Sequence, residues 1–371
     1  MIWLNELNLS ILHFLDTLKI FETNYKFKPT IKHNQNKSCN IELGFSNYAL
    51  KIYTLLDQIE NIPNKDLVKW IDYIKSFQNI ESKYPQNSFI DGNYIKLFNQ
   101  QNNENLIKLG FKKTVNFVAG TNFKSNKIKI ENYIRAETKQ SIATLLEINE
   151  KIDNKFKDFP KNEFQLNKFL TNLNWKYPWS SGGQLAAVAL FSKSQMETKD
   201  FDKNKQIFSI FLSKLVKQDG MYYESTKPIS KKELVNGAMK IISALDWLDI
   251  EVHYPKKIID TCLNIDPESE GCDIVDIVYV LYRCSKYTNY KKKEIVDYYK
   301  KILDIIFDHY KPDEGGFSYY KDSCQTNYYD VKFSISDNIA DIHGTLLMLW
   351  AVVMIMDVIE INYFNFQIIK P

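Results

Sequence analysis

Two aspartates three positions apart, in an otherwise apolar segment, are the first candidates for chemistry. They are Asp273 and Asp276 in "DIVDIVYVLY". This spacing places both carboxylates on one face of a helix, where a like charge or burial would raise one pKa enough for proton donation. The competing interpretation is structural, with Asp273 as a helix N-cap and Asp276 as a second acid in the first turn.

Other polar residues stand at the starts of apolar segments. His343 follows Asp341 in "DIHGTLLML", and either a structural hydrogen bond or a site role would suit it. Arg135 and Glu137 begin "RAETKQ", where they would form an ion pair or the arginine would hold a phosphate or carboxylate. Trp179 precedes a Gly-Gly pair and suits either close packing or a wall against a sugar or isoprenoid. The catalytic candidates are Asp273, Asp276 and His343, and the substrate-binding candidates are Arg135, Glu137, Gln140, Trp179, Gln184, Asn236 and Asp341.

Two kinds of helix alternate along the chain and would position these residues. One kind is apolar nearly all round, which is typical of a helix buried on every side. The other kind is amphipathic and lysine-rich, which is typical of an outer helix with one wet face. The apolar helices are expected at 40–56, 135–148, 180–194, 233–248, 272–284 and 341–356. The amphipathic helices are expected at 65–77, 163–175, 203–217, 255–265 and 291–310. Strand signals are few, so the sequence predicts an all-α fold. A closed (α/α)6 toroid of six inner and six outer helices explains both kinds of helix. An irregular helical bundle or solenoid is the alternative architecture.

An acid-glycine-aromatic arrangement recurs after outer helices. It reads "DEGGFSYY" at 313–320 and "DGMYY" at 219–223, with a weaker copy, "DGNYIKLF", from Asp91. Glycine permits the positive φ that a tight turn requires. We therefore expect a turn that crosses one end of the helical assembly, with the following aromatic covering that end.

Composition narrows the function classes. The chain has 371 residues, 44 % of them hydrophobic, and a net charge of +3 without a basic stripe, which argues against a nucleic-acid binder. The abundant lysine and asparagine are typical of an AT-rich, bacterial-like genome. Five cysteines without a CxxC pair indicate a reducing compartment. No signal peptide is expected, and the run 344–356 is too short to span a bilayer, so a cytoplasmic location is predicted. We expect a single domain over residues 1–371, with an N-terminal helical extension at 1–38 and an insertion-rich segment at about 60–133.

The order of outer helix, acid-Gly-Gly-aromatic turn and buried inner helix resembles the terpenoid cyclases and the β subunits of protein prenyltransferases. "DEGGFSYY" followed by "DIHGTLLMLWAVVMIM" carries the resemblance best. "DIVDIVYVL" is similar to the Asp-x-Asp-Asp motif of class II cyclases: Asp273 and Asp276 match its outer aspartates, and Val275 stands where that family has its proton donor. The resemblance to prenyltransferases implies a zinc site that would use Cys272, Asp273 and His343, although the family's Asp-x-Cys order is not reproduced. The sequence does not identify a cofactor; a divalent metal, Zn or Mg, is the candidate.

The resemblance implies an enzyme that acts on an isoprenoid or similar amphiphile in a central cavity, with an aspartate pair for acid or electrostatic catalysis. The expected partner is a small-molecule or lipid-like substrate. Peripheral contact with a membrane is a further option. A carbohydrate-active (α/α)6 hydrolase or lyase is the first alternative, and a non-catalytic toroid that binds a ligand or partner is the second.

Overall fold

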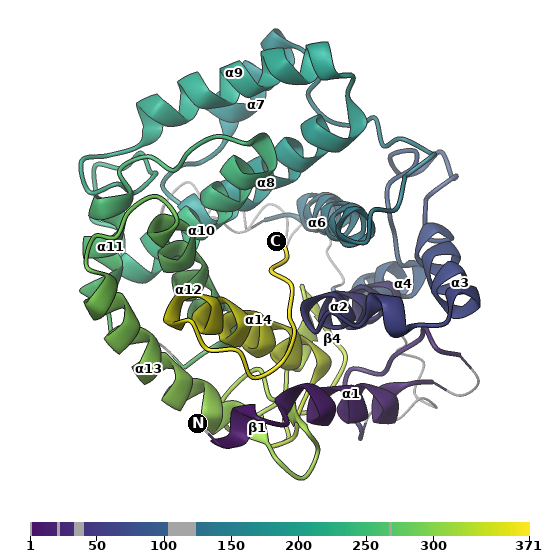
Figure 1. Cartoon of the computed structure of the whole chain (residues 1–371). Helices are drawn as coiled ribbons and strands as arrows, with labels where there is room; N and C mark the ends of the chain where they lie inside the picture. Colours follow the sequence, from purple (N-terminus) through teal and green to yellow (C-terminus); the bar gives the residue numbers. More distant parts are fainter. Residues whose placement is uncertain (1, 21–22, 33–40, 103–123, 267–268) are drawn as a thin grey trace.

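The computed structural model describes residues 2–20, 23–32, 41–102, 124–266 and 269–371 (Figure 1). Helices make up most of this part of the chain, and its strands are only two residues long, which confirms the all-α class. Cys39 and Asn40, together with parts of the proposed N-terminal extension and of the 60–133 segment, lie outside the described residues.

Six helices surround the centre of the molecule. They are α2 (Leu43–Leu55), α6 (Asn126–Glu147), α8 (Pro178–Gln195), α10 (Lys231–Leu248), α12 (Gly271–Ser285) and α14 (Ile342–Ile359). Each helix contacts the next in this order, and α14 contacts α2, so the contacts run round a closed cycle (Figure 1). These are the six segments that the sequence predicts as apolar all round, and most of their side chains are buried.

The amphipathic helices pack on the outside of these six. They are α3 (Asn64–Lys75), α7 (Glu163–Asn172), α9 (Thr198–Leu215), α11 (Pro255–Leu263) and α13 (Lys292–His309). Each buries only one side; in α3 the buried residues are Trp70 and Ile74. A further helix, α1 (Leu7–Leu18), follows the short 3-10 helix η1 (Ile2–Leu4) and buries Leu7, Ile11 and Leu15 in the same hydrophobic core.

The start of α6 differs from the expectation. The helix begins at Asn126, nine residues before the predicted start at 135, and Ser125 caps it by accepting a hydrogen bond from the Ile128 N–H. The first turns of α6 are largely exposed and contain Lys127 and Lys129, so they are not apolar all round. The apolar pattern in the sequence therefore indicated only the second half of this helix. As a result, Arg135 and Glu137 lie in the middle of a helix and not at its start.

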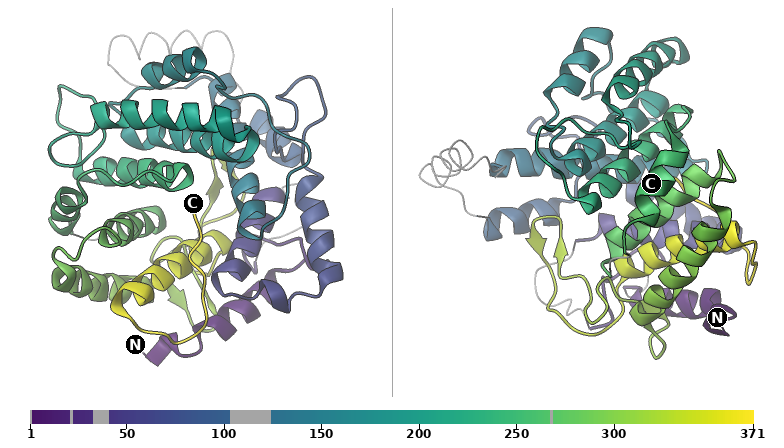
Figure 2. Two further views of the ribbon diagram at one scale, coloured as in Figure 1. Left: turned by 45° about the horizontal axis from the view of Figure 1, so that its top comes forward. Right: turned by 90° about the vertical axis from the view of Figure 1, so that its left-hand side faces the viewer.

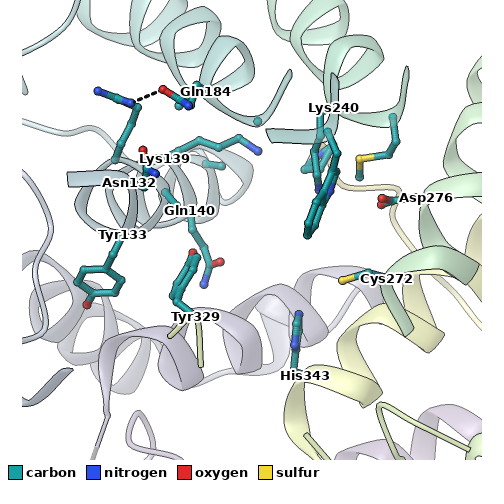
Figure 3. A pocket seen from close by; sticks show the side chains of 18 of the residues that line it. Asn132, Tyr133, Lys139, Gln140, Gln184, Lys240, Cys272, Asp276, Tyr329 and His343 are labelled. Carbon is teal, nitrogen blue, oxygen red and sulfur yellow. Dashed lines mark hydrogen bonds between the residues drawn. The ribbon is translucent and has the colours of Figure 1, made fainter. Parts of the chain in front are cut away.

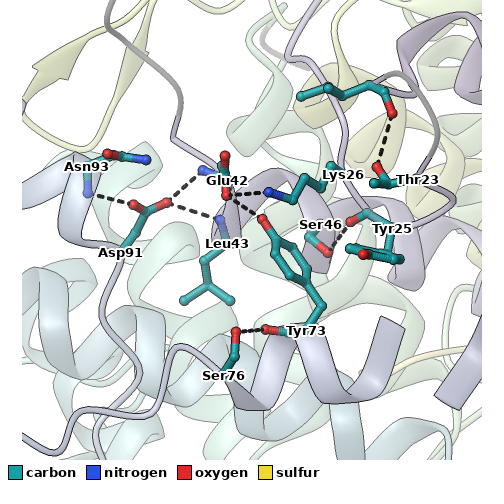
Figure 4. Close-up of polar contacts among 11 residues, drawn as sticks. Thr23, Tyr25, Lys26, Glu42, Leu43, Ser46, Tyr73, Ser76, Asp91 and Asn93 are labelled. Carbon is teal, nitrogen blue, oxygen red and sulfur yellow. Dashed lines mark hydrogen bonds and ion pairs between the residues drawn. The ribbon is translucent and has the colours of Figure 1, made fainter. Parts of the chain in front are cut away.

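The weak third copy of the turn motif has a different role from the one predicted. Asp91 is the N-cap of α4 (Gly92–Gln101), a helix that the sequence analysis did not expect. One carboxylate oxygen accepts from the backbone N–H groups of Asn93 and Tyr94. The other oxygen accepts from the backbone N–H groups of Glu42 at 2.6 Å and Leu43 at 3.1 Å (Figure 4). Asp91 therefore caps α4 and α2 together and fixes the angle between them. Nearby, the Glu42 carboxylate accepts from the Tyr73 hydroxyl at 2.5 Å.

Two hairpins complete the described structure. The strands β1 (Tyr310–Lys311) and β2 (Gly316–Phe317) form the first, in "DEGGFSYY". The strands β3 (Asn327–Tyr328) and β4 (Val331–Lys332) form the second, which protrudes from the helices in Figure 2 and contacts α4.

The two stronger motif copies make the predicted turn. Gly220 has a φ of 83° and Gly315 has a φ of 80°. The aromatic residues that follow, Tyr222 and Phe317, are buried. β2 contacts both α14 and α1, so this turn joins the N-terminal helix to the last inner helix.

Replacing Gly315 with alanine should destabilise the protein by roughly 2–3 kcal/mol, because a positive φ strains any residue with a Cβ. The new Cβ would also lie only 2.5 Å from the Ser10 carbonyl oxygen of α1. Urea denaturation of Gly315→Ala against the unchanged protein measures this loss.

Gly92→Ala is the matched control, since a Cβ there has no neighbour within 4 Å and alanine suits a helix better than glycine. Equal stability losses at Gly315 and Gly92 would contradict the proposed strain.

Candidate functional site

A cavity of about 760 Å³ lies between the six central helices (Figure 3). Most of its wall is apolar or aromatic, and every central helix contributes to it. The apolar and aromatic lining residues are Tyr48, Tyr133, Ala136, Ala143, Trp179, Ala187, Met239, Val275, Tyr329, Leu346, Leu347, Trp350 and Ile369. Such a wall suits a ligand with a substantial apolar body.

The first turns of three helices meet at this cavity. Trp179 near the start of α8, Cys272 in α12 and His343 in α14 all line it. Trp179 is 45 % exposed and therefore lies at the rim. These three helices therefore direct their N-terminal ends to the same cavity.

Asp276 is the buried carboxylate of the cavity. Its side chain is 1 % exposed and lines the cavity, and within the described part of the chain its Oδ2 has no hydrogen-bond partner. Burial raises the pKa of Asp276 to about 7, an effect that the nearby Lys240 opposes and that Asp273 reinforces. A carboxyl group with this pKa carries its proton in part of the molecules at neutral pH and is suited to donate it.

Asp273 does not share the cavity with Asp276. Because α12 begins at Gly271, Asp273 lies in the first turn and is not the N-cap that the sequence suggested. Its carboxylate accepts from Asn236 Nδ2 at 2.7 Å and pairs with Lys232 Nζ at 2.6 Å, so it ties α12 to α10. The predicted catalytic pair is therefore divided: Asp276 lines the cavity, and Asp273 and Asn236 form a contact between helices.

His343 is held against an aromatic ring. It stacks on Tyr48 of α2 with ring centroids 4.6 Å apart and an interplanar angle of 5°. Burial and the positive charge of Lys240 lower the pKa of His343 to about 3, so the imidazole is neutral. Its Nδ1 has no hydrogen-bond partner among the described residues.

The candidate zinc ligands do not fit a metal. Cys272 and His343 line the cavity, but Asp273 is engaged by Asn236 and Lys232. Burial raises the pKa of the Cys272 thiol to about 11, whereas zinc binds the thiolate. Nowhere in the described ranges do three His, Cys, Asp or Glu side chains gather as metal ligands.

Asp341 is a structural residue in this arrangement. It is 1 % exposed and caps α14 by accepting from the Gly344 N–H at 2.7 Å. Its second oxygen accepts from the Tyr319 and Gln325 N–H groups at 2.7 and 3.0 Å. With these three backbone donors satisfied, the carboxylate is fully used and does not line the cavity.

Of the remaining candidates, Arg135, Gln140, Gln184 and Trp179 line the cavity, whereas Glu137 does not. Arg135 donates to Gln184 Oε1 at 2.9 Å, and Glu137 accepts from the Tyr328 hydroxyl at 2.5 Å. The expected Arg135–Glu137 ion pair is thus replaced by contacts to α8 and to the β3–β4 hairpin. Burial raises the pKa of Glu137 to about 8.

Sequence analysis missed the basic side chains of the cavity. Besides Arg135, five lysines line it: Lys51, Lys124, Lys129, Lys139 and Lys240. Lys51, Lys139 and Lys240 come from the middle of helices that the sequence predicts as buried all round. A charged residue in the centre of such a helix was the available signal, because burial of an unpaired charge needs a reason.

Some of these lysines are paired and others are not. Lys51 pairs with Glu147 at 3.0 Å, and Lys129 pairs with Asp330 in the β3–β4 hairpin at 2.9 Å. Within the described residues, no hydrogen bond or ion pair engages the ammonium groups of Lys139 and Lys240. The central part of the cavity is therefore basic as well as apolar.

The C-terminal segment 361–371 closes one side of the cavity. In Figure 1 it runs across the centre of the six helices. The Gln367 N–H donates to the Leu55 carbonyl at 3.0 Å, and Trp247 Nε1 donates to the Pro371 carbonyl at 3.0 Å. Ile369 and Pro371 line the cavity.

Comparison with known protein families, with curated proteins and with solved structures found no match. By length and composition, one helix of the described part, α14, would be able to cross a membrane, but 78 % of it is buried inside the protein. The prediction that this apolar run forms a buried helix agrees with that burial.

We expect Asp276→Asn to stabilise the protein more at high pH than at low pH. The folded pKa of about 7 lies above the unfolded value of about 3.9, so the stability that the protonated group provides is lost as pH rises from about 4 through 7. Removing the ionisable group should raise the free energy of unfolding by about 1–3 kcal/mol more at pH 8 than at pH 5.

Chemical denaturation at both pH values measures the difference. Asp273→Asn is the control, because loss of its contact with Lys232 should destabilise the protein at both. A pH-independent effect of Asp276→Asn would show that this carboxyl titrates normally.

Proposed function

We propose that the six central helices and their outer partners form an (α/α)6 toroid like that of terpenoid cyclases and prenyltransferases. We further propose that the chain is an enzyme acting on an isoprenoid or similar amphiphile in the central cavity. The closed cycle of helix contacts and the position of the cavity between these helices support the architecture. The same fold can support different chemistries, and the residues of the cavity distinguish among them.

The observation that carries the proposal is the placement of Asp276. A buried carboxyl group, whose Oδ2 has no hydrogen-bond partner among the described residues, lines a cavity whose wall is mainly apolar and aromatic. Protonation of an apolar substrate at a carbon or an ether oxygen creates positive charge, which the rings of Tyr48, Tyr329 and Trp350 can stabilise by cation–π interaction. Asp276 would supply the proton, although it does not occupy the position of the cyclase proton donor, where Val275 stands.

The other residues would support this role indirectly. His343 is neutral and stacked on Tyr48, so it would orient that ring and not transfer a proton. Arg135 and Gln184, joined by a hydrogen bond, would bind a polar end of the substrate at the cavity wall. The proposed setting is cytoplasmic, with peripheral membrane contact if the substrate is membrane-derived.

The carbohydrate-active alternative has less support. A glycosidase needs two carboxyl groups at the site, about 5 to 9.5 Å apart. Asp273 is engaged by Lys232 and Asn236, and Asp330, which lines the cavity, is paired with Lys129. Asp276 is left without a second free acid among the described cavity residues. A toroid that binds a ligand without converting it would need the cavity but not the protonated Asp276.

A thermal-shift screen of isoprenoid diphosphates against oligosaccharides tests the substrate class. An isoprenoid ligand at 100 times its Kd should stabilise the protein by about 2.7 kcal/mol. Gly183→Leu should weaken this effect, because Gly183 lines the cavity and a Cβ there has no neighbour within 4 Å. Gly92→Leu, outside the cavity, should not.

Catalysis is tested separately with the ligand that the screen identifies. Asp276→Asn should retain the ligand-induced stabilisation and lose roughly 10²-fold or more in turnover, the usual scale of a lost general acid. Stabilisation by oligosaccharides alone would eliminate the isoprenoid proposal. Binding without any conversion by the unchanged protein would favour the non-catalytic toroid.

A further inference from the structure

Lys139 is the residue whose setting the proposed function leaves unexplained. It lies in the centre of α6, and its side chain extends into the cavity (Figure 3). A lysine in a largely apolar cavity ordinarily has a carboxylate partner, because desolvation of the ammonium group is unfavourable. Glu147 of the same helix, whose charge favours protonation of Lys139, pairs with Lys51 at 3.0 Å.

The groups around Lys139 oppose its protonation. Lys51 from α2 and Lys240 from α10 act on it with positive charge, and Glu147 only partly offsets them. Arg135, Asp276 and His343 face the same cavity from α6, α12 and α14. Burial, followed by these two lysines, lowers the pKa of Lys139 to about 7.

Lys51 provides an internal comparison. It also lines the cavity and is buried, but it has the carboxylate partner that Lys139 lacks. The two lysines therefore differ in pairing, and they also differ in exposure, since Lys139 is half-buried. An amine that is desolvated and close to other cations is the kind that acts as a nucleophile toward carbonyl carbon.

We propose that Lys139 is a covalent binding site for an aldehyde or ketone with an apolar chain, which it holds as an imine. The inference is independent of the proton-transfer role of Asp276. The apolar wall beside it, which includes Met239, Leu346 and Trp350, would hold the chain of the carbonyl compound.

The reaction requires no oxidant or reductant. The lone pair of the neutral Lys139 nitrogen forms a C–N bond to the carbonyl carbon, and the carbonyl oxygen takes up a proton to give a carbinolamine. In net terms, the proton on that oxygen is one of the two amine protons. The second amine proton leaves with the oxygen as water when the C–O bond breaks and the C=N bond forms, and the product is the neutral imine, which a further proton converts to the iminium ion. The neighbouring positive charge of Lys240 favours the neutral amine that begins this sequence.

Reductive trapping tests the proposal. The full chain is incubated with octanal and cyanoborohydride at pH 7, and the alkylated lysines are located by peptide mass spectrometry. Lys139 is about half neutral at this pH, whereas an ordinary lysine with a pKa of about 10.4 is less than ~0.1 % neutral. We expect Lys139 to be modified at least about tenfold faster than the exposed Lys65 of α3.

The pH dependence in the unchanged protein gives a readout that needs no variant. The ratio of Lys139 modification to that of exposed lysines should fall as the pH rises above 7. The neutral fraction of Lys139 levels off there, whereas that of an ordinary lysine, with a pKa of about 10.4, keeps increasing. Lys139→Met should abolish the fast phase, and Lys65→Met should leave it unchanged. Circular dichroism of both variants establishes that they are folded.

Modification of Lys139 no faster than that of Lys65, or a fast phase that persists in folded Lys139→Met, would overturn the proposal. The outcome is separable from the isoprenoid screen. That screen reports reversible ligand binding and turnover through Asp276, and it can succeed or fail whatever Lys139 does.

Discussion

The carboxylate of Asp341 joins three parts of the backbone on which the central arrangement depends. One oxygen caps α14, and the other accepts from Tyr319 after the glycine turn and from Gln325 before the β3–β4 hairpin. These N–H groups would otherwise lack partners at the end of a buried helix, at a cost of about 1–3 kcal/mol each. Close approach of the chain is possible because Gly344 has no Cβ; one would lie 2.4 Å from the Tyr319 nitrogen. One side chain thus sets where α14 begins and where the hairpin lies, and both line the cavity.

Other polar side chains repeat this logic at the remaining helix ends. Asp91 caps α4 and α2 together, and Asp273 connects α12 to α10 through Asn236 and Lys232. Asp91 accepts from backbone N–H groups of two elements, whereas Asp273 of α12 is held by an amide and an ammonium group that both belong to α10. Helices that are apolar all round have no preferred rotation from hydrophobic burial alone, so directional contacts of this kind determine which side of each helix faces the centre.

Several polar groups that line the cavity lack such hydrogen-bond partners. Asp276, His343 and Gln140 each have a buried polar atom without a partner in the described structure, and Lys139 lacks a counter-ion there. Unsatisfied groups of this kind reduce stability. Others, among them Glu137 Oε1 and His309 Nε2, lie outside the cavity lining. The unsatisfied groups of the cavity differ in that they face a space of about 760 Å³, which a ligand can fill.

The sequence by itself determined the all-α class, the burial of six helices, the positive φ of Gly220 and Gly315, and the presence of Asp276 and His343 among the site candidates. These follow from periodicity, glycine conformation and helix-start chemistry, which are local properties. Only the tertiary structure decided that Asp273 contacts α10 and Asp276 the cavity, that Asp341 is a structural cap, and that Lys139 and Lys240 meet in one space. The direction of a side chain from a buried helix depends on the rotation of that helix against its neighbours. Contacts between residues far apart in the chain set that rotation, and no local pattern records them.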